Sequence, residues 1–192
     1  MNHLQWKTRN NISPQGLPKV YICSRPEDFE SFFPAAADDI LRIQNCALWY
    51  TDPAQKITDW DAHLDSLRQM NLFVLLVTEK LLTEPNDALE KEFRFAIQNC
   101  IPVLPLMQAP GLEALFNAKC GHLQTLSRHT ADNTALRYDY KLEQYLHSAL
   151  LDDALIRFDN ERLKNAMELL KELAKTRQII LFSCQEREKW YE

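Results

Sequence analysis

Two short apolar runs constrain the fold of this chain more than any other feature of its sequence. Leu72–Thr78 (LFVLLVT) and Ile101–Leu106 (IPVLPL) are rich in Val, Leu and Ile and are seven and six residues long. Runs of this kind are typical of strands that are buried on both faces of a parallel sheet. The segment between them, Leu82–Asn99, is long enough to form the crossover helix of a β-α-β unit. The pattern therefore predicts a parallel sheet covered by helices.

The same alternation of strands and helices continues on both sides of this unit. Lys19–Ser24 and Cys46–Tyr50 have the composition of strands, and the apolar residues of Pro26–Ile43 recur at three- and four-residue steps, as on a buried helix face. Ala135–Tyr138 is predicted as a fifth strand at an edge. Repeated alternation predicts an α/β fold, a flavodoxin-like three-layer sandwich with a central parallel sheet. We assign residues 19–150 to this domain.

Two of the predicted helices carry capping signals at their starts. Thr58 or Asp59 stands directly before one helix and has a side chain suited to the N-cap. Asp87 precedes another helix and is followed three residues later by Glu90, which is the pattern of a capping box. The second signal predicts that the helix before the Ile101–Leu106 strand begins at Asp87.

Charge and composition exclude several classes of partner. The net charge is −5, which argues against a nucleic-acid partner. No apolar run approaches the roughly 20 residues of a membrane span, so no membrane contact is expected. Residues 1–18 are polar and are predicted to be a flexible N-terminal arm. The five cysteines are odd in number and widely spaced, which favours a reducing compartment, and we expect a cytoplasmic protein.

Glycine is scarce in this chain. The three glycines are Gly16, Gly111 and Gly121, and no two of them have the spacing of a phosphate loop or of a dinucleotide-binding turn. Any nucleotide must therefore be bound by side chains rather than by a glycine-lined backbone cradle.

Glu92 is the principal candidate for chemistry. On the Leu82–Asn99 helix it lies about one step, ~60–80°, from the centre of the apolar stripe, which predicts a place at the rim of the core. That stripe consists of Leu89, Phe93 and Ala96. A carboxylate there lies near the crevice in which open α/β sheets bind ligands, and it can stabilise an oxocarbenium-like charge. The alternative is a surface residue, favoured modestly by the helix dipole.

Four segments of the chain occur in a recognisable order. They are VYICSRPED at the first strand, ALWYTD at the second, LFVLLVT at the third, and DALEKEFRFAIQNCIPVLPLM across the next helix and strand. With these segments, residues 19–150 resemble a TIR (Toll/interleukin-1 receptor) domain. EDFESFF, QNCALWY, IPVLPLM and PGLEALF are similar to the N-terminal TIR-like module of long bacterial proteins with tandem TIR units.

The resemblance implies one of two functions. Some TIR domains self-associate and recruit other TIR domains in signalling, and others cleave the nicotinamide–ribose bond of NAD⁺. In the enzymes a glutamate on the third conserved helix, four residues after a tryptophan, carries the chemistry. These two positions match Glu92 and Ala88. The residues that the resemblance assigns to NAD⁺ binding are Ser24, Arg25, Trp49, Tyr50 and Asp52.

Departures from the TIR pattern leave both functions open. Ala88 stands where the enzymes have tryptophan, Thr51–Trp60 contains no glycine, and Thr78 replaces a strand-end serine. The first expectation is a bacterial TIR-like signalling protein that acts by self-association, with weak or lost NAD⁺ hydrolysis. The alternative is an active NAD⁺ glycohydrolase of antiphage-type defence. Where NAD⁺ is cleaved it is a substrate, and no resident cofactor is expected.

Other polar residues carry weaker signals. Cys120 and His122 have the spacing of half a metal site, but no second pair lies at ligand spacing, so no metal site is predicted. His63, His129 and His147 belong to no nucleophile pattern with Cys or Ser. We expect these three histidines on the surface of helices or loops.

The C-terminal segment, residues 151–192, is predicted to be an appendage of one helix and one strand. Leu163–Ala174 has the period of an amphipathic helix, and Gln178–Ser183 is apolar enough for a buried strand. Leu150–Glu188 resembles the C-terminal end of SMC-like, ABC-type ATPases, in which two acids hold Mg²⁺ and the attacking water. The matching acids are Asp152 and Asp153. Because the glycine-dependent phosphate loop is absent, a third option is the remnant of an ATPase fusion without nucleotide binding.

Overall fold

The computed structural model describes residues 4–127 and 135–152, together with Glu168 and Lys171. The chain divides into two compact units, residues 1–149 and 150–192. The first unit contains a six-stranded sheet. Its strands are β1 (Leu4–Thr8), β2 (Lys19–Cys23), β3 (Ala47–Thr51), β4 (Leu72–Val77), β5 (Val103–Met107) and β6 (Leu126–Ser127).

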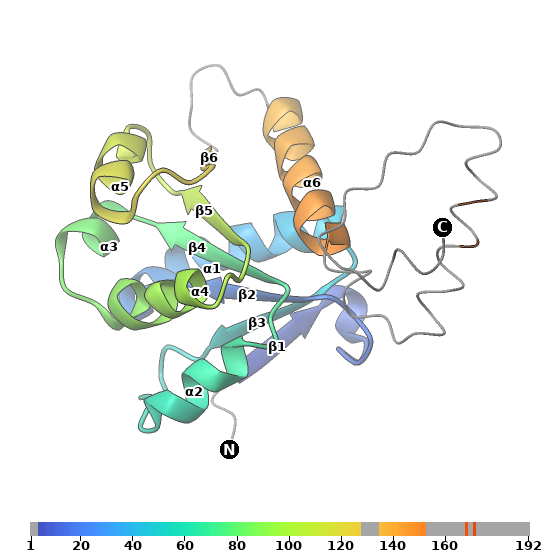
Figure 1. Cartoon of the computed structure of the whole chain (residues 1–192), viewed down its shortest axis with the longest axis horizontal. Helices are drawn as coiled ribbons and strands as arrows, with labels where there is room; N and C mark the ends of the chain where they lie inside the picture. Colours follow the sequence, from blue (N-terminus) through green and yellow to red (C-terminus); the bar gives the residue numbers. More distant parts are fainter. Residues whose placement is uncertain (1–3, 128–134, 153–167, 169–170, 172–192) are drawn as a thin grey trace. The chain divides into compact units, whose positions relative to one another are not determined.

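The strand order in the sheet is β1-β3-β2-β4-β5-β6 (Figure 1). β1 runs antiparallel to β3, and every other pair of neighbours is parallel. The predicted α/β class is therefore confirmed, and the central sheet, which was predicted to be parallel, is parallel except at β1. Without β1, the order is compatible with that of flavodoxin-like sheets, in which the second strand of the chain lies outside the first. In such sheets the carboxyl ends of the strands border a crevice at the point where the order reverses.

Helices connect the strands along the chain. They are α1 (Pro26–Ile43), α2 (Trp60–Leu67), α3 (Glu79–Thr83), the π-helical turn η2 (Ala88–Phe93), α4 (Arg94–Gln98), α5 (Leu112–Cys120) and α6 (Ala135–Asp152), with a 3₁₀ turn η1 at Arg9–Asn11. None of the described helices is both long and apolar enough to cross a membrane.

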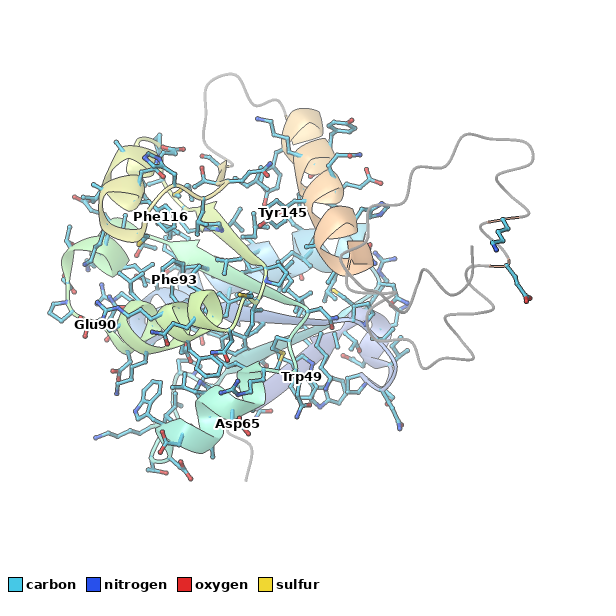
Figure 2. All side chains as sticks on the ribbon, viewed as in Figure 1. Trp49, Asp65, Glu90, Phe93, Phe116 and Tyr145 are labelled. Carbon is cyan, nitrogen blue, oxygen red and sulfur yellow. The ribbon has the colours of Figure 1, made fainter. Side chains whose placement is uncertain are left out.

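Successive residues of each strand point to opposite sides of the sheet, so both faces carry side chains. Helices pack against both faces. On one face, Tyr21 and Phe73 belong to a core that also contains residues of α2, α3, η2 and α5. Figure 2 shows Phe93 and Phe116 in this layer, where their rings meet edge to face at 6.2 Å between centroids. On the other face, Tyr50 packs against Phe33 of α1 at 4.5 Å.

Within the first unit, two polar contacts join α6 to β5 and to α1. The hydroxyl of Tyr145 donates to the backbone carbonyl of Val103 in β5. The carboxylate of Asp139 accepts two hydrogen bonds from the guanidinium of Arg42 in α1, at 2.8 and 2.9 Å. α1 and α6 are therefore neighbours.

The N-terminal segment is more ordered than predicted. Residues 1–18 were expected to be a flexible arm, and this is wrong for Leu4–Thr8, which pairs with β3 from Leu4 opposite Thr51 to Thr8 opposite Ala47. Leu4 and Thr8 are buried, whereas Trp6 is 42% exposed. Because an edge strand has solvent on one side, its composition resembles that of a loop, and the sequence therefore gave little sign of it.

The predicted edge strand at Ala135–Tyr138 is also wrong. Ala135 begins α6, and the last strand of the sheet is the two-residue β6, Leu126–Ser127. The buried residues of α6 recur at helical steps, and this period continues through the region assigned to the strand. They are Tyr138, Leu142, Leu146, Ala149 and Leu150. In the second unit, the predicted strand Gln178–Ser183 and most of the helix Leu163–Ala174 lie outside the described residues.

The two capping predictions have different outcomes. Asp59 caps α2, since its carboxylate accepts a hydrogen bond from the Ala62 amide at 3.0 Å. Asp87 makes no such bond, and its carboxylate pairs instead with Lys91 at 2.9 Å. The side-chain oxygen of Asn86 accepts a hydrogen bond from the backbone amide of Leu89 at 2.9 Å. Asn86, one residue before Asp87, therefore supplies the capping hydrogen bond at the start of this helix.

Candidate functional site

A pocket of about 480 Å³ lies at the carboxyl ends of β2 and β3. We call it the rim pocket. Its wall consists of residues of these strands, the loops that follow them, the start of α1, one residue of α2, the loop before η2 and two residues of η2. The lining residues are Tyr21, Ile22, Ser24–Glu27, Phe29, Thr51–Ile57, Trp60, Pro85–Ala88 and Glu92. The place corresponds to the crevice in which open α/β sheets bind ligands.

Glu92 is the buried carboxylate of this pocket. The residue is only 5% exposed, and both of its carboxylate oxygens have partners. Oε1 accepts a hydrogen bond from the Tyr21 hydroxyl at 2.8 Å and lies 2.6 Å from Nε2 of His63. Oε2 accepts from the Cys23 thiol at 2.9 Å. Three side chains from β2 and α2 therefore hold one carboxylate at the pocket wall.

Glu92 lies deeper than its position on an ideal helix predicts. It belongs to η2, a single π-helical turn, and the neighbouring residues Ala88, Leu89 and Phe93 are buried with it. A π turn has wider i→i+5 hydrogen bonding, and such turns occur frequently at functional sites. The predicted rim position is corrected to a buried one, because η2 departs from the α-helical period and α2 supplies a partner for the carboxylate.

The direction of the hydrogen bonds around Glu92 follows from the protonation of Tyr21 and Cys23. Burial, followed by the negative charge of Glu92, raises the pKa of both the Tyr21 phenol and the Cys23 thiol well above their ordinary values. Both groups are therefore neutral donors to Glu92 at physiological pH. Since the Tyr21 proton is directed at Glu92, the hydroxyl of Thr51, 2.8 Å away, donates to the Tyr21 oxygen. The Cys23 thiol is held as a donor and is not a thiolate nucleophile.

Arg25 brings to the same pocket a guanidinium group in which one nitrogen atom, Nη1, has no partner among the described residues. The residue is 8% exposed, and its Nη2 pairs with Glu84 at 2.9 Å and with Glu27 at 3.4 Å. Its Nη1 is buried and has no hydrogen-bond partner among the described residues. An unsatisfied buried guanidinium nitrogen is costly, so this atom is the place where an anionic ligand group is expected.

Four of the six predicted site residues line the rim pocket. They are Ser24, Arg25, Asp52 and Glu92. Asp52 also organises the loop that follows β3, because its carboxylate accepts from the Ala54 amide at 2.9 Å and from the Gln55 side chain at 3.0 Å. The structure therefore brings the ends of the first two parallel strands and the crossover glutamate into one site.

Trp49 and Tyr50 are not among the lining residues. Tyr50 points to the opposite face of the sheet, where it contacts Phe29 and Phe33 of α1. Trp49 lies on the same face as Glu92 but packs against the hydrophobic core, and Lys19 stands 5.9 Å from its ring. The structure therefore does not bring these two residues to the rim pocket. Strand alternation turns Tyr50 to the far face of the sheet, and Trp49 packs against the core.

The structure adds residues that the sequence analysis missed. His63 was expected on the surface, and this is wrong, because it is 4% exposed and contacts Glu92. Its spacing of four residues from the buried Leu67 was the available signal, as these positions share a helix face. Tyr21, Cys23 and Trp60 were also missed as site residues. Within the described residues, no group of three or more His, Cys, Asp or Glu side chains is placed to hold a metal ion.

No family model matches the sequence, and no curated protein matches it. Function is therefore inferred from the chemistry of the site itself. The rim pocket combines a buried carboxylate with an unpartnered guanidinium nitrogen and an aromatic side chain, Trp60. Such a set suits a ligand that has an anionic group and a planar ring and that develops positive charge during reaction.

The buried thiol of Cys46 is expected to make the stability of the first unit fall at high pH. Burial raises the pKa of Cys46 from the ordinary 9.0 to about 12. Below pH 9 both folded and unfolded chains keep this proton, so stability does not depend on it. As the pH rises from 9 towards 12 only the unfolded chain loses the proton, and the free energy of unfolding falls by about 1.4 kcal/mol per unit.

This prediction is checked by urea unfolding at several pH values between 8 and 11. Cys46→Ala should show a shallower loss of stability with pH than the unchanged chain. Cys100→Ala, at an exposed thiol, should leave the slope as it is. Equal slopes for the unchanged chain and Cys46→Ala would contradict the prediction.

Proposed function

We propose that this chain is a TIR-like domain that hydrolyses the nicotinamide–ribose bond of NAD⁺ in the rim pocket. The observation that supports the proposal is the placing of Glu92 and Arg25 in one pocket at the carboxyl edge of the sheet. The parallel strand order also agrees with the flavodoxin-like arrangement expected of a TIR domain. The pocket volume of about 480 Å³ lies within the range of small-molecule sites.

The proposed reaction uses the carboxylate as an electrostatic group. As the bond between ribose C1′ and the nicotinamide nitrogen breaks, its electron pair leaves with nicotinamide, which becomes neutral. The ribose then carries oxocarbenium character, which the Glu92 carboxylate stabilises. Water adds to C1′ and loses one proton, so the products are nicotinamide, ADP-ribose and a proton. Arg25 Nη1 is suited to the pyrophosphate.

A second candidate is an interaction module that signals by self-association and does not cleave NAD⁺. The observation that favours it is that both carboxylate oxygens of Glu92 already accept hydrogen bonds from protein side chains. Ala88, which lines the pocket, also provides no ring against which nicotinamide can stack.

Incubation of the purified chain with NAD⁺ separates the two candidates. Hydrolysis predicts that nicotinamide and ADP-ribose are released in equal amounts, at a rate proportional to protein concentration, as measured by chromatography. Heat-denatured protein is the control. Release that does not exceed this control at high protein concentration would exclude hydrolysis, and mass by light scattering across a dilution series would then test self-association.

A further inference from the structure

We propose that His63 is a positioning residue that orients the Glu92 carboxylate for reaction. The inference rests on the proposed hydrolysis and deepens it. His63 does not line the rim pocket, so it acts through Glu92 and not on the substrate. His63 belongs to α2, whereas the other two partners of the carboxylate, Tyr21 and Cys23, belong to β2. Side chains from two different elements therefore hold Glu92.

The contact between the side chains of His63 and Glu92 is short and buried from solvent. Nε2 of His63 lies 2.6 Å from Oε1 of Glu92, and the two side chains are 1% and 6% exposed. Because Oε1 is an acceptor, Nε2 carries the proton that faces it. A hydrogen bond to a carboxylate is shorter and stronger than one between neutral groups, and it strengthens further as water is excluded.

Aromatic rings fix the plane of the imidazole. The Trp60 ring meets His63 edge to face at 5.5 Å and 88°, and the Tyr21 ring meets it at 6.3 Å and 67°. Tyr21 also donates to the same oxygen of Glu92. The imidazole therefore has little freedom to turn, and its donor direction determines which way the Oε1 lone pairs, and hence the carboxylate plane, must point.

The other ring nitrogen argues against a purely structural role. Nδ1 of His63 is buried and has no hydrogen-bond partner among the described residues. A buried polar atom without a partner lowers the stability of the fold. The buried His63–Glu92 pair is itself only weak evidence of a gain in stability, because both groups lose their contact with water. An apolar residue would fill the same space without this cost. The retained imidazole is explained by its effect on Glu92.

The kinetic test compares substitutions of His63 in the full chain. His63→Ala should lower kcat about 10- to 100-fold, as when outer partners of functional ligands are removed, and should leave KM unchanged. His63→Gln can present an amide N–H near the Nε2 position and should recover most of this loss. His122→Ala, at an exposed histidine, is the matched control and should behave as the unchanged chain.

A second measurement does not depend on activity. In NMR spectra of labelled protein, the ¹³C carboxyl signal of Glu92 should shift in His63→Ala and return towards its original position in His63→Gln. Thermal melting confirms that each variant is folded. An unshifted Glu92 signal in folded His63→Ala overturns the proposal, as does an equal fall in kcat for His63→Ala and His63→Gln. If the unchanged chain releases no nicotinamide, the proposed hydrolysis fails, and the Glu92 signal alone decides whether His63 orients the carboxylate.

Discussion

Glu92→Gln is expected to lower the rate of NAD⁺ hydrolysis by about 10²–10³-fold, the range for loss of one group that stabilises developing charge. The amide has nearly the shape of the carboxylate but no negative charge, so it cannot stabilise the oxocarbenium-like ribose. Its NH₂ group would also face donors, since Tyr21, Cys23 and His63 all direct protons at this side chain. The measurement is the initial rate of nicotinamide release at saturating NAD⁺.

Glu90→Gln is the matched control for this substitution. Glu90 lies in the same π-helical turn but is exposed, and Figure 2 shows it labelled on that turn. The same loss of charge there should leave the rate within about twofold, because charge in solvent is strongly screened. Equal losses in Glu90→Gln and Glu92→Gln, or full activity in folded Glu92→Gln, would show that Glu92 does not carry the reaction.

Phe116→Ala should destabilise the domain by about 3–5 kcal/mol, the usual cost of removing a fully buried aromatic ring. Phe116 is 0% exposed and packs edge to face against Phe93, the residue after Glu92. Both rings are labelled in the core layer of Figure 2. Because a domain of this kind is stable by only about 5–15 kcal/mol, the loss should be plain in urea unfolding.

The neighbouring residue provides the control for the stability experiment. Leu115 precedes Phe116 in α5 but is 39% exposed. Leu115→Ala should change the free energy of unfolding by less than about 0.5 kcal/mol, the usual range for surface positions. Similar losses for Leu115→Ala and Phe116→Ala would mean that α5 does not pack on the sheet as described.

The central strands could be predicted because their chemistry is local. Leu72–Val77 is buried at every position, and such a run suits few structures other than an interior strand. The edges of the sheet carry no such signal. β1 is polar enough to resemble a loop, and its strand conformation depends on pairing with β3, which lies some forty residues later in the chain.

The candidate site was predictable in part for the same reason. Ser24, Arg25 and Asp52 follow directly after strands, and strand ends of a parallel sheet meet at one edge. His63 follows no strand. It reaches Glu92 only because α2 packs against this edge, a long-range arrangement that no local pattern describes.

The amino-acid order by itself determined the alternation of strands and helices, the parallel class of the sheet and the carboxyl edge as the place for polar residues. These follow from hydrophobic periods that act over a few residues. The tertiary structure alone decided that Glu92 is buried, that Tyr21, Cys23 and His63 hold it, and that Trp49 and Tyr50 turn away from the pocket. The physical reason is that burial and hydrogen-bond partners belong to the packed chain, in which residues far apart in sequence exclude water from one another.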